Sequence, residues 1–240
     1  MNKLIISLLL FFNSVITFSQ SLKKDTVLLN KLLNRGNYLL SSNLDSGLII
    51  SQNCIALALK VKEKKFINQS YNLHGQVNYR LGNLDVALES FRKQEKFASN
   101  LSEKSAAIIN QGNIFIEKGT NDSAILYYKI AGNIALNAKD TLDYVKTRNN
   151  IAFVHKIEGR FDSSVYYQLQ ALKAFEKSKN KNGIGQSYIQ LAFTQYSRKF
   201  FLESKAYITK AILIYKELND TPNLAICYTI LGGVYSEINE

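Results

Sequence analysis

The sequence predicts an all-α protein, a solenoid in which antiparallel helix pairs stack one on the next. Three observations support this fold class. Small residues recur every 37 to 40 residues, and the apolar residues around them follow the 3.6-residue period of a helix. Hydrophobic residues make up 46% of the chain, whereas Pro occurs once and Gly 12 times, so a long core is possible. We therefore expect one continuous solenoid of about 40 residues per repeat, without an internal domain boundary.

The clearest unit runs from Gly112 to Ala131. Gly112 and Phe115 share one helical face, Gly119 stands where the chain must reverse, and Ala124 belongs to a second helix. A small residue at the first position lets the two helices of a pair lie close together. The equivalent anchors elsewhere are Gly75, Ala152, Ala192 and Gly232.

This pattern resembles the tetratricopeptide repeat, in which a large residue followed by Gly or Ala recurs in each first helix. The matching pairs are His74-Gly75, Gln111-Gly112, Ile151-Ala152, Leu191-Ala192 and Leu231-Gly232. The resemblance implies a right-handed α-α superhelix. The family's unit of about 34 residues is shorter, and its Pro after the second helix is absent here. HEAT or armadillo-type repeats have the longer period and are the alternative, but the Gly and Ala of the turn and second helix argue against them.

Residues 1–19 read as a signal peptide, with one Lys before a short apolar run. Thr17 and Ser19 are small, which places the cleavage site after Ser19, and no Cys follows the run to carry a lipid anchor. We expect an exported protein, periplasmic or extracellular. An uncleaved anchor is the alternative, although the run is short for ~30 Å of hydrocarbon. No other stretch is expected to cross a membrane.

Residues 21–62 form a degenerate N-terminal capping repeat, because their anchor position holds Arg35, which is too large for close helix contact. Four repeats follow over residues 66–223, separated by short polar joints. Residues 224–240 form the first helix of an incomplete further repeat. Nine of the twelve residues 224–235 are apolar, so we expect this helix to be covered by more chain or by a partner.

Four acids recur where each second helix begins: Asp45, Asp85, Asp122 and Asp162. A repeated acid can mark a ligand site, but an Asp at a helix start also accepts a bond from a free backbone N–H and faces the positive end of the helix dipole. We expect these four acids to cap the second helices.

The net charge is +11, and many lysines lie near the ends of second helices, as Lys173 and Lys177 do. Cations there complement the helix dipole. The aromatic residues fall on packing positions, so nucleic acid is not an expected partner, while acidic envelope polymers or lipids remain an alternative. Cys54 and Cys227 stand in small-residue positions several repeats apart, which predicts buried thiols and no disulfide.

No motif for chemistry is present. His74 and His155 lie in different repeats and form no zinc motif. The short Gly183-Ile184-Gly185 run follows no strand, so it predicts no phosphate cradle. We therefore expect no enzyme activity, no cofactor and no metal.

What remains is a binding surface. In proteins with this repeat, first helices line a concave face that binds peptides or a partner's helix. Amide side chains on that face can bond a peptide backbone in both directions, and Tyr and Phe supply rigid contact area. By position from each anchor, the predicted lining is Gln69, Asn72, Gln76, Tyr79, Arg80, Asn110, Asn113, Lys146, Asn149, Asn150, Phe153, Lys156, Gln186, Gln190, Phe193 and Tyr196.

The sequence thus predicts an exported scaffold that binds a protein or peptide partner, with a further contact through the exposed C-terminal helix. The alternative function is the sensory ectodomain of a longer membrane signalling protein, a histidine kinase or a helix-turn-helix regulator, since exported repeats of this length resemble the front ends of such proteins. A third possibility, an enzyme within the solenoid, would need a cluster of titratable residues that the sequence does not offer.

Overall fold

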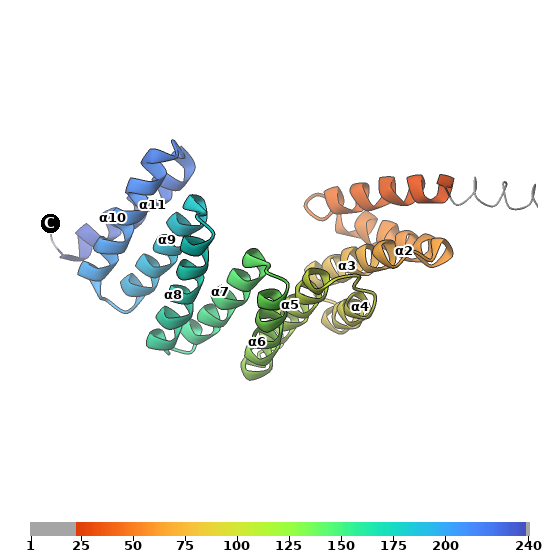
Figure 1. Cartoon of the computed structure of the whole chain (residues 1–240), viewed down its shortest axis with the longest axis horizontal. Helices are drawn as coiled ribbons and strands as arrows, with labels where there is room; N and C mark the ends of the chain where they lie inside the picture. Colours follow the sequence, from red (N-terminus) through yellow and green to blue (C-terminus); the bar gives the residue numbers. More distant parts are fainter. Residues whose placement is uncertain (1–22, 239–240) are drawn as a thin grey trace, which may run out of the picture. The chain divides into compact units, whose positions relative to one another are not determined.

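The computed structural model describes residues 23–238, and every regular element in that range is an α-helix (Figure 1). The predicted signal peptide and its cleavage site lie outside the described residues. A helix over residues 23–39 comes first. The others are α2 (Leu44–Val61), α3 (Lys64–Arg80), α4 (Leu84–Lys96), α5 (Leu101–Glu117), α6 (Asn121–Asn137), α7 (Thr141–Ile157), α8 (Phe161–Lys177), α9 (Lys181–Ser197), α10 (Phe201–Glu217) and α11 (Thr221–Ile238).

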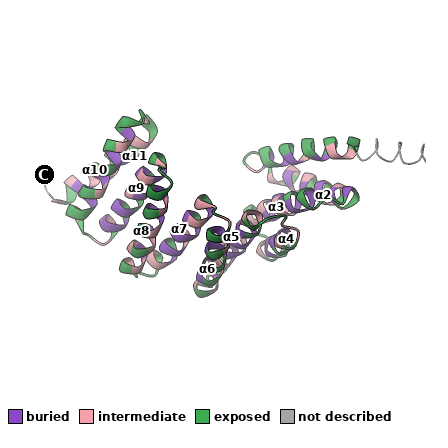
Figure 2. Ribbon diagram, in the orientation of Figure 1, coloured by how far each residue is buried: buried purple, intermediate pink, exposed green. Residues whose placement is uncertain are grey.

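The described residues divide into two compact units, and the division falls within α5, between Ile114 and Phe115. This division falls inside a single helix, so the expectation that the solenoid has no internal domain boundary stays a prediction. Within each unit, consecutive helices pack against one another, and each helix turns one stripe of buried residues toward its neighbours (Figure 2). This one-sided burial follows from the 3.6-residue apolar period.

Unit 1 begins with the helix over residues 23–39, which packs with α2 and α3 around one hydrophobic core. Arg35, the predicted anchor of this first repeat, is exposed. Its neighbour Gly36 makes the close contact instead, because a Cβ added there would lie 2.4 Å from Cδ2 of Leu73. The prediction was thus wrong by one residue, and the first repeat keeps a small residue at the helix crossing.

Helix α2 is long and apolar enough to cross a membrane by length and composition alone. The expectation that no stretch beyond residues 1–19 meets this criterion is therefore wrong. Cys54 and Ala58 of α2 are fully buried in the core of unit 1. A helix that packs into a protein core can meet the same criterion.

Unit 2 repeats the predicted crossing points. Ala152 of α7 and Ala192 of α9 are buried, and Ile208 and Ala211 of α10 are fully buried in the same core cluster as Ala192. In unit 1 the equivalent anchor is Gly75, where an added Cβ would lie 2.5 Å from the ring of Phe91. Small anchors are therefore required where first and second helices touch.

The reversals between paired helices occur at the predicted positions. The backbone angle φ is positive at each reversal: 79° at Gly82, 70° at Gly119, 73° at Gly159 and 62° at Lys199, which occupies the equivalent position in the next repeat. A positive φ suits Gly because it has no Cβ. The predicted reversal at Gly119 is therefore confirmed, and Gly82, Gly159 and Lys199 make the equivalent turn in the other repeats.

The predicted capping acids lie two residues too far into their helices. In α2 the N-cap residue is Asn43, whose Oδ1 accepts the Ser46 N–H at 2.9 Å. The N-cap residues of the other second helices make no side-chain cap bond; they are Asn83 in α4, Thr120 in α6, Arg160 in α8 and Phe200 in α10. The acids instead lie in the first helical turn, where they face the helix dipole. Asp162 also forms an ion pair with Arg198, with 2.9 Å between Oδ1 and Nη2.

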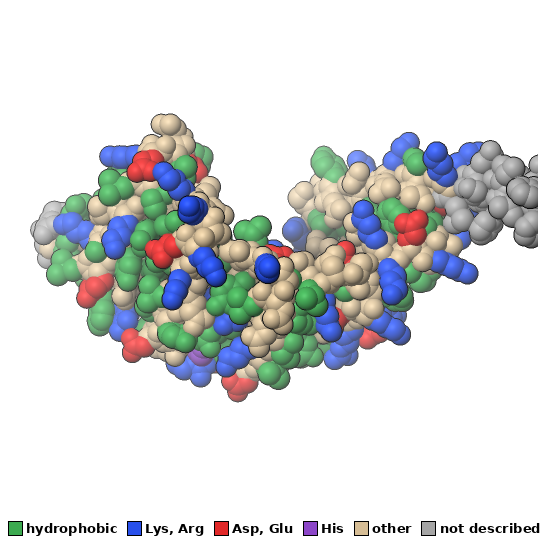
Figure 3. Space-filling model, viewed as in Figure 1, with side chains coloured by type: hydrophobic (Ala, Val, Ile, Leu, Met, Phe, Trp, Pro, Cys, Tyr) green, Lys and Arg blue, Asp and Glu red, His purple; other side chains and the backbone are tan. Residues whose placement is uncertain are grey.

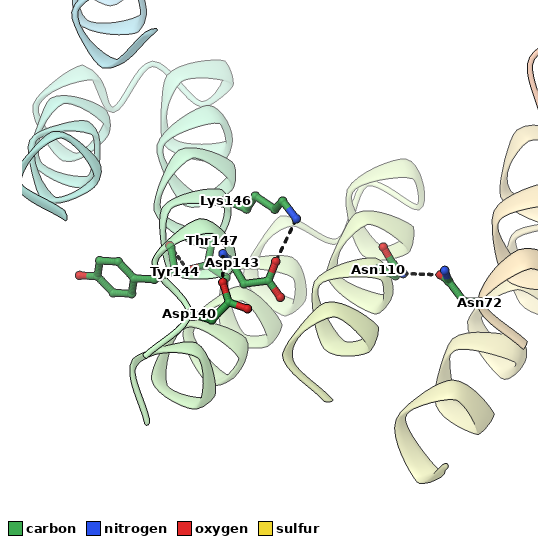
Figure 4. A network of polar contacts seen from close by, with 7 residues as sticks. All are labelled: Asn72, Asn110, Asp140, Asp143, Tyr144, Lys146 and Thr147. Atoms are coloured by element: carbon green, nitrogen blue, oxygen red, sulfur yellow. Dashed lines mark hydrogen bonds and ion pairs between the residues drawn. The ribbon is translucent and has the colours of Figure 1, made fainter. Parts of the chain in front are cut away.

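Side chains cap the first helices α5, α7, α9 and α11, at a spacing of 40 residues. The Oδ1 atoms of Asn100, Asp140, Asn180 and Asp220 accept backbone N–H groups at 2.8, 3.0, 2.9 and 3.1 Å. Such a cap satisfies one of the free N–H groups of the first turn. These residues lie in the polar joints, and Figure 4 shows the bond from the Asp143 N–H to Asp140.

Candidate functional site

The predicted lining residues are all described, and none of them is fully buried. They divide between the two units, so they do not form a single site that the structure defines. Unit 1 holds those of α3 and α5, which are Gln69, Asn72, Gln76, Tyr79, Arg80, Asn110 and Asn113. Unit 2 holds those of α7 and α9, which are Lys146, Asn149, Asn150, Phe153, Lys156, Gln186, Gln190, Phe193 and Tyr196.

The amides of unit 1 bond mainly to one another. Asn72 Oδ1 accepts from Gln76 Nε2 at 3.1 Å and from Asn110 Nδ2 at 3.3 Å, the latter between α3 and α5 (Figure 4). Asn110 Nδ2 also lies 3.4 Å from Gln94 Oε1. Arg80 donates to the carbonyl oxygen of Leu40 at 2.9 Å. These side chains therefore hold adjacent helices together, and a ligand would have to compete with bonds that already exist.

Unit 2 brings two exposed aromatic rings and one lysine together. Phe153 of α7 and Phe193 of α9 are 48% and 46% exposed. Lys156 Nζ lies 5.8 Å from the centroid of the Phe153 ring and 4.7 Å from that of Phe193. A cation within about 6 Å of a ring face is attracted by the ring quadrupole. We call Phe153, Lys156 and Phe193 the aromatic–lysine patch.

The electrostatics of Lys156 set it apart from Lys146. Burial lowers the pKa of Lys156 below its usual range. In the part of the chain that the structure describes, no carboxylate lies within ion-pair distance of Lys156. Lys146 is already neutralised, because its Nζ lies 2.9 Å from Oδ1 of Asp143 (Figure 4). Lys156 therefore has the more favourable charge for an acidic group of a partner.

Tyr196 lies at the edge of this region and contacts α11. Its hydroxyl donates to Glu237 Oε1 at 3.5 Å, and its ring meets that of Phe201 edge-on at 5.6 Å. Two contacts to neighbouring helices fix the ring. Tyr196 therefore has a packing role in addition to its place in the predicted lining.

Both histidines contact side chains of the following helix. Nδ1 of His74 bonds to Ser90 Oγ at 2.8 Å, and burial, followed by the charge of Lys93, lowers the pKa of this histidine. His155 stacks on Tyr167 at 5.5 Å. Between residues 23 and 238 no group of three His, Cys, Asp or Glu side chains is placed to hold a metal.

Both thiols are free and buried, which confirms the prediction of core cysteines. Burial raises the pKa of Cys54 to about 11, and burial together with the charge of Asp220 does the same for Cys227. A thiol with so high a pKa is a poor nucleophile at neutral pH because the thiolate is scarce. Neither cysteine is therefore suited to catalysis.

Comparison with solved structures identifies the architecture. Aspartyl phosphate phosphatase F of Bacillus subtilis superposes with a TM-score of 0.78 and 14% identity over 93% of this chain, which spans 61% of that protein. A protein assigned as a kinesin light chain of Podosopora anserina, with nearly identical TPR-like repeats, gives 0.65 and 11% over 80% of this chain and 97% of its own. The fold is of the tetratricopeptide (TPR) type.

A Rap protein solved in complex with the competence and sporulation factor shares the TPR fold, with a TM-score of 0.57 and 12% identity over 88% of this chain and 71% of that one. At these identities the likeness concerns the fold alone. No family model matches the sequence. No curated protein matches it either.

Proposed function

We propose that this protein is a binding module without catalytic activity, and that the aromatic–lysine patch of unit 2 holds an extended segment of a partner protein. Lys156 carries the proposal. It is a partly buried cation that lies between two exposed rings and has no carboxylate partner among the described residues. A carboxylate of a partner would restore the electrostatic stabilisation that Lys156 loses by leaving water.

The surroundings of the patch suit a peptide. Phe153 and Phe193 offer rigid apolar area at a low cost in conformational entropy, as the anchors of protein interfaces commonly do. Asn149, Gln186 and Gln190 lie on the same two helices and carry amides that can both donate to and accept from a peptide backbone. The Rap protein solved with its factor supports the use of this fold for binding a partner.

Selection from a phage-displayed library of random peptides tests the proposal. We expect immobilised wild-type protein to enrich peptides in which an acidic residue is adjacent to an apolar one. Phe153→Ala/Phe193→Ala should lower the affinity of the enriched peptides by roughly a hundredfold, because two anchor rings are removed. Lys156→Gln should reduce the preference for the acidic residue.

Phe200→Ala is the matched control. Phe200 is also an exposed ring, at 44%, and it also lies under a cation, with Arg198 at 4.1 Å, but it is not on a first helix. This variant should retain the affinity of the wild type. If Phe200→Ala and the double variant lost affinity equally, or if no peptide were enriched, the patch would not be the binding surface.

Export is a separate proposal, which rests on residues 1–19 of the sequence alone. The mature N-terminus, measured by mass spectrometry after expression in a bacterial host, should begin at Gln20. Retention of residues 1–19 would favour the uncleaved anchor. The sensory ectodomain of a longer signalling protein would also use the patch for ligand binding, and only the coding sequence beyond Glu240 distinguishes it from a separate scaffold.

A further inference from the structure

A groove of about 720 Å3 lies in unit 2 between the end of α6, the start of α7 and the end of α8. Leu136, which is 55% exposed, and Tyr144 contribute apolar surface, while Lys139, Lys173 and Lys177 contribute three ammonium groups. The volume falls within the range of about 300–1,000 Å3 that is typical of ligand pockets. None of the lining residues belongs to the predicted partner-binding set, so this is a different surface from the aromatic–lysine patch.

The groove is basic. Among its lining residues Asp140 is the only carboxylate, and its Oδ1 already accepts the backbone N–H of Asp143. A groove of about 500 Å3 in unit 1 is lined instead by Asp85, Glu89 and Lys93 among its charged residues. The excess of lysines is therefore not shared by every groove, although a groove of about 510 Å3 at the start of unit 1 is also lined by three lysines, Lys23, Lys24 and Lys31. Figure 3 shows how Lys and Arg side chains outnumber acids over the visible surface in general.

A fourth cation lies behind the wall of the groove. Arg148 is only 9% exposed, and its guanidinium carbon lies 4.8 Å from the centroid of the Tyr144 ring. Nη1 donates to Gln170 Oε1 at 3.4 Å and Nε to Thr147 Oγ1 at 3.5 Å, both near the upper limit for a hydrogen bond. Tyr144 and Gln170 both line the groove, so the buried charge is directly adjacent to it.

The chain is built to accommodate Arg148. A Cβ added to Gly132 of α6 would lie 2.2 Å from Nη2 of Arg148 and 2.7 Å from Oγ1 of Thr147. Glycine weakens the interior of a helix, so its presence here is explained by the space that the guanidinium needs. No carboxylate within residues 23–238 forms an ion pair with Arg148. A buried cation without an acid is unfavourable unless another group supplies the opposite charge.

We propose that the groove formed by Leu136, Lys139, Tyr144, Gln170, Lys173 and Lys177 is a second docking site, which binds a segment of a partner protein that presents an apolar side chain flanked by carboxylates. The apolar side chain packs on Leu136 and Tyr144. The carboxylates pair with the three lysines, and their negative charge offsets that of Arg148. Complementary charge of this kind also steers association.

The shape of the surface favours a protein segment over a membrane. An anionic bilayer is broad, so it attracts any exposed lysine and does not enter a groove. A peptide inserts side chains, and it can therefore use both the apolar floor and the lysine rim. The two partners are distinguished by whether binding depends on the groove lysines or only on total charge.

The probe is a short fluorescein-labelled peptide in which two glutamates alternate with two leucines. Fluorescence anisotropy measures its binding to the whole chain. Lys139→Gln/Lys173→Gln/Lys177→Gln should lower its affinity by roughly tenfold or more, which is about 1.4 kcal/mol. Because the probe also carries the acidic and apolar neighbours that the aromatic–lysine patch is proposed to bind, the lysine variants are compared in a Phe153→Ala/Phe193→Ala background, where the groove is the site that remains. The loss of probe affinity in the groove variant is therefore expected whether or not the aromatic–lysine patch binds a partner.

Lys129→Gln/Lys199→Gln/Lys216→Gln is the matched control, because it removes the same total charge from three exposed lysines outside the groove. Lys199 resembles Lys139 in backbone, since each stands two residues after the end of a helix with positive φ, at 62° and 56°. This control should bind the probe within about twofold of the Phe153→Ala/Phe193→Ala parent. A peptide analogue with glutamine in place of glutamate should bind neither that parent nor the control variant.

Three results would overturn the proposal: equal losses in the groove variant and the control, undiminished binding of the glutamine analogue, or no binding of the probe by the wild type. Vesicles with phosphatidylglycerol provide a further arm. If they bound the wild type and lost affinity equally in both lysine variants while the peptide did not bind, the basic surface would serve a lipid bilayer and not a protein segment.

Discussion

Helices α9 and α11 carry the same residue pattern 40 positions apart, but among the residues that the structure describes only α9 is followed by a second helix that covers it. Leu191 and Ala192 of α9 are fully buried, whereas Leu231 is half-buried and Gly232 is exposed on α11. Tyr188 stacks on Tyr207 of α10, with 6.2 Å between ring centroids. Its counterpart Tyr228 is 50% exposed.

A residue on the outer side of a helix is buried in this fold because the next helix covers it. A sequence position becomes a core position only where the next element covers it, because each hairpin is too small to bury its own apolar face. The inner side of α11 shows the same rule. Cys227 and Val234 face the preceding repeat and are fully buried, although the outer side of their helix is open.

The largest expected difference is between Leu191→Ala and Leu231→Ala. Truncation at the fully buried position should lower the free energy of unfolding by about 2–5 kcal/mol, through lost burial and the cavity left behind. The half-buried counterpart should cost roughly 1 kcal/mol or less. Urea unfolding followed by circular dichroism measures both. Equal costs would mean that α11 is covered in solution, by a second copy or another element.

Thiol labelling measures the two sides of α11 separately. In a Cys54→Ala background, Cys227 should react with a disulfide reagent at pH 8 about a hundredfold more slowly than an exposed thiol, because burial raises its pKa to about 11 and the thiolate is scarce.

The exposed reference is the thiol introduced by Gly232→Cys in a chain that lacks both native cysteines. A Cβ at position 232 meets no atom within 4 Å, so this thiol should label freely. Rapid labelling of Cys227 would contradict the buried inner face. Slow labelling at position 232 would show that the outer face is covered.

The smallest change in the free energy of unfolding is expected when Leu is placed at the anchor positions of α9 and α11. Ala192→Leu should destabilise the protein by about 1–3 kcal/mol, because the site is fully buried and has no space for the added atoms. Gly232→Leu should stabilise α11 by about 0.5–1 kcal/mol, since the site is open and Leu favours the helix more than Gly does. Thermal melts should show shifts of opposite sign, and shifts of the same sign would remove the distinction between the two helices.

The repeat and its turns were predictable because they depend on residue size. A small anchor such as Ala192 and a turn residue such as Gly159 each answer a steric requirement that recurs at a constant spacing. The last helix was also recognised from its apolar residues. In the structure α11 begins at Thr221, three residues earlier than expected, with Pro222 in its first turn.

Polar contacts were less predictable, because they depend on one or two residues of register and on which side chains meet in space. Asp122 was expected to cap α6, but Thr120 is the N-cap residue. Asn72 and Asn110 were expected to face a ligand, and they bond to each other. Arg148 gave no signal in the sequence, since its burial depends on Gly132 of another helix.

The capping residues of the first helices have a consequence for how the chain can change in length. Asn180 and Asp220 stand at the two ends of one repeat and make the same bond, so that repeat starts and finishes with interchangeable joints. If a copy of residues 181–220 were inserted after Asp220, the first helix of the copy and the helix after the copy would each be preceded by a capping side chain, as they are now. Growth by whole hairpins therefore needs no new interface chemistry, and the number of hairpins is free to vary under selection for reach.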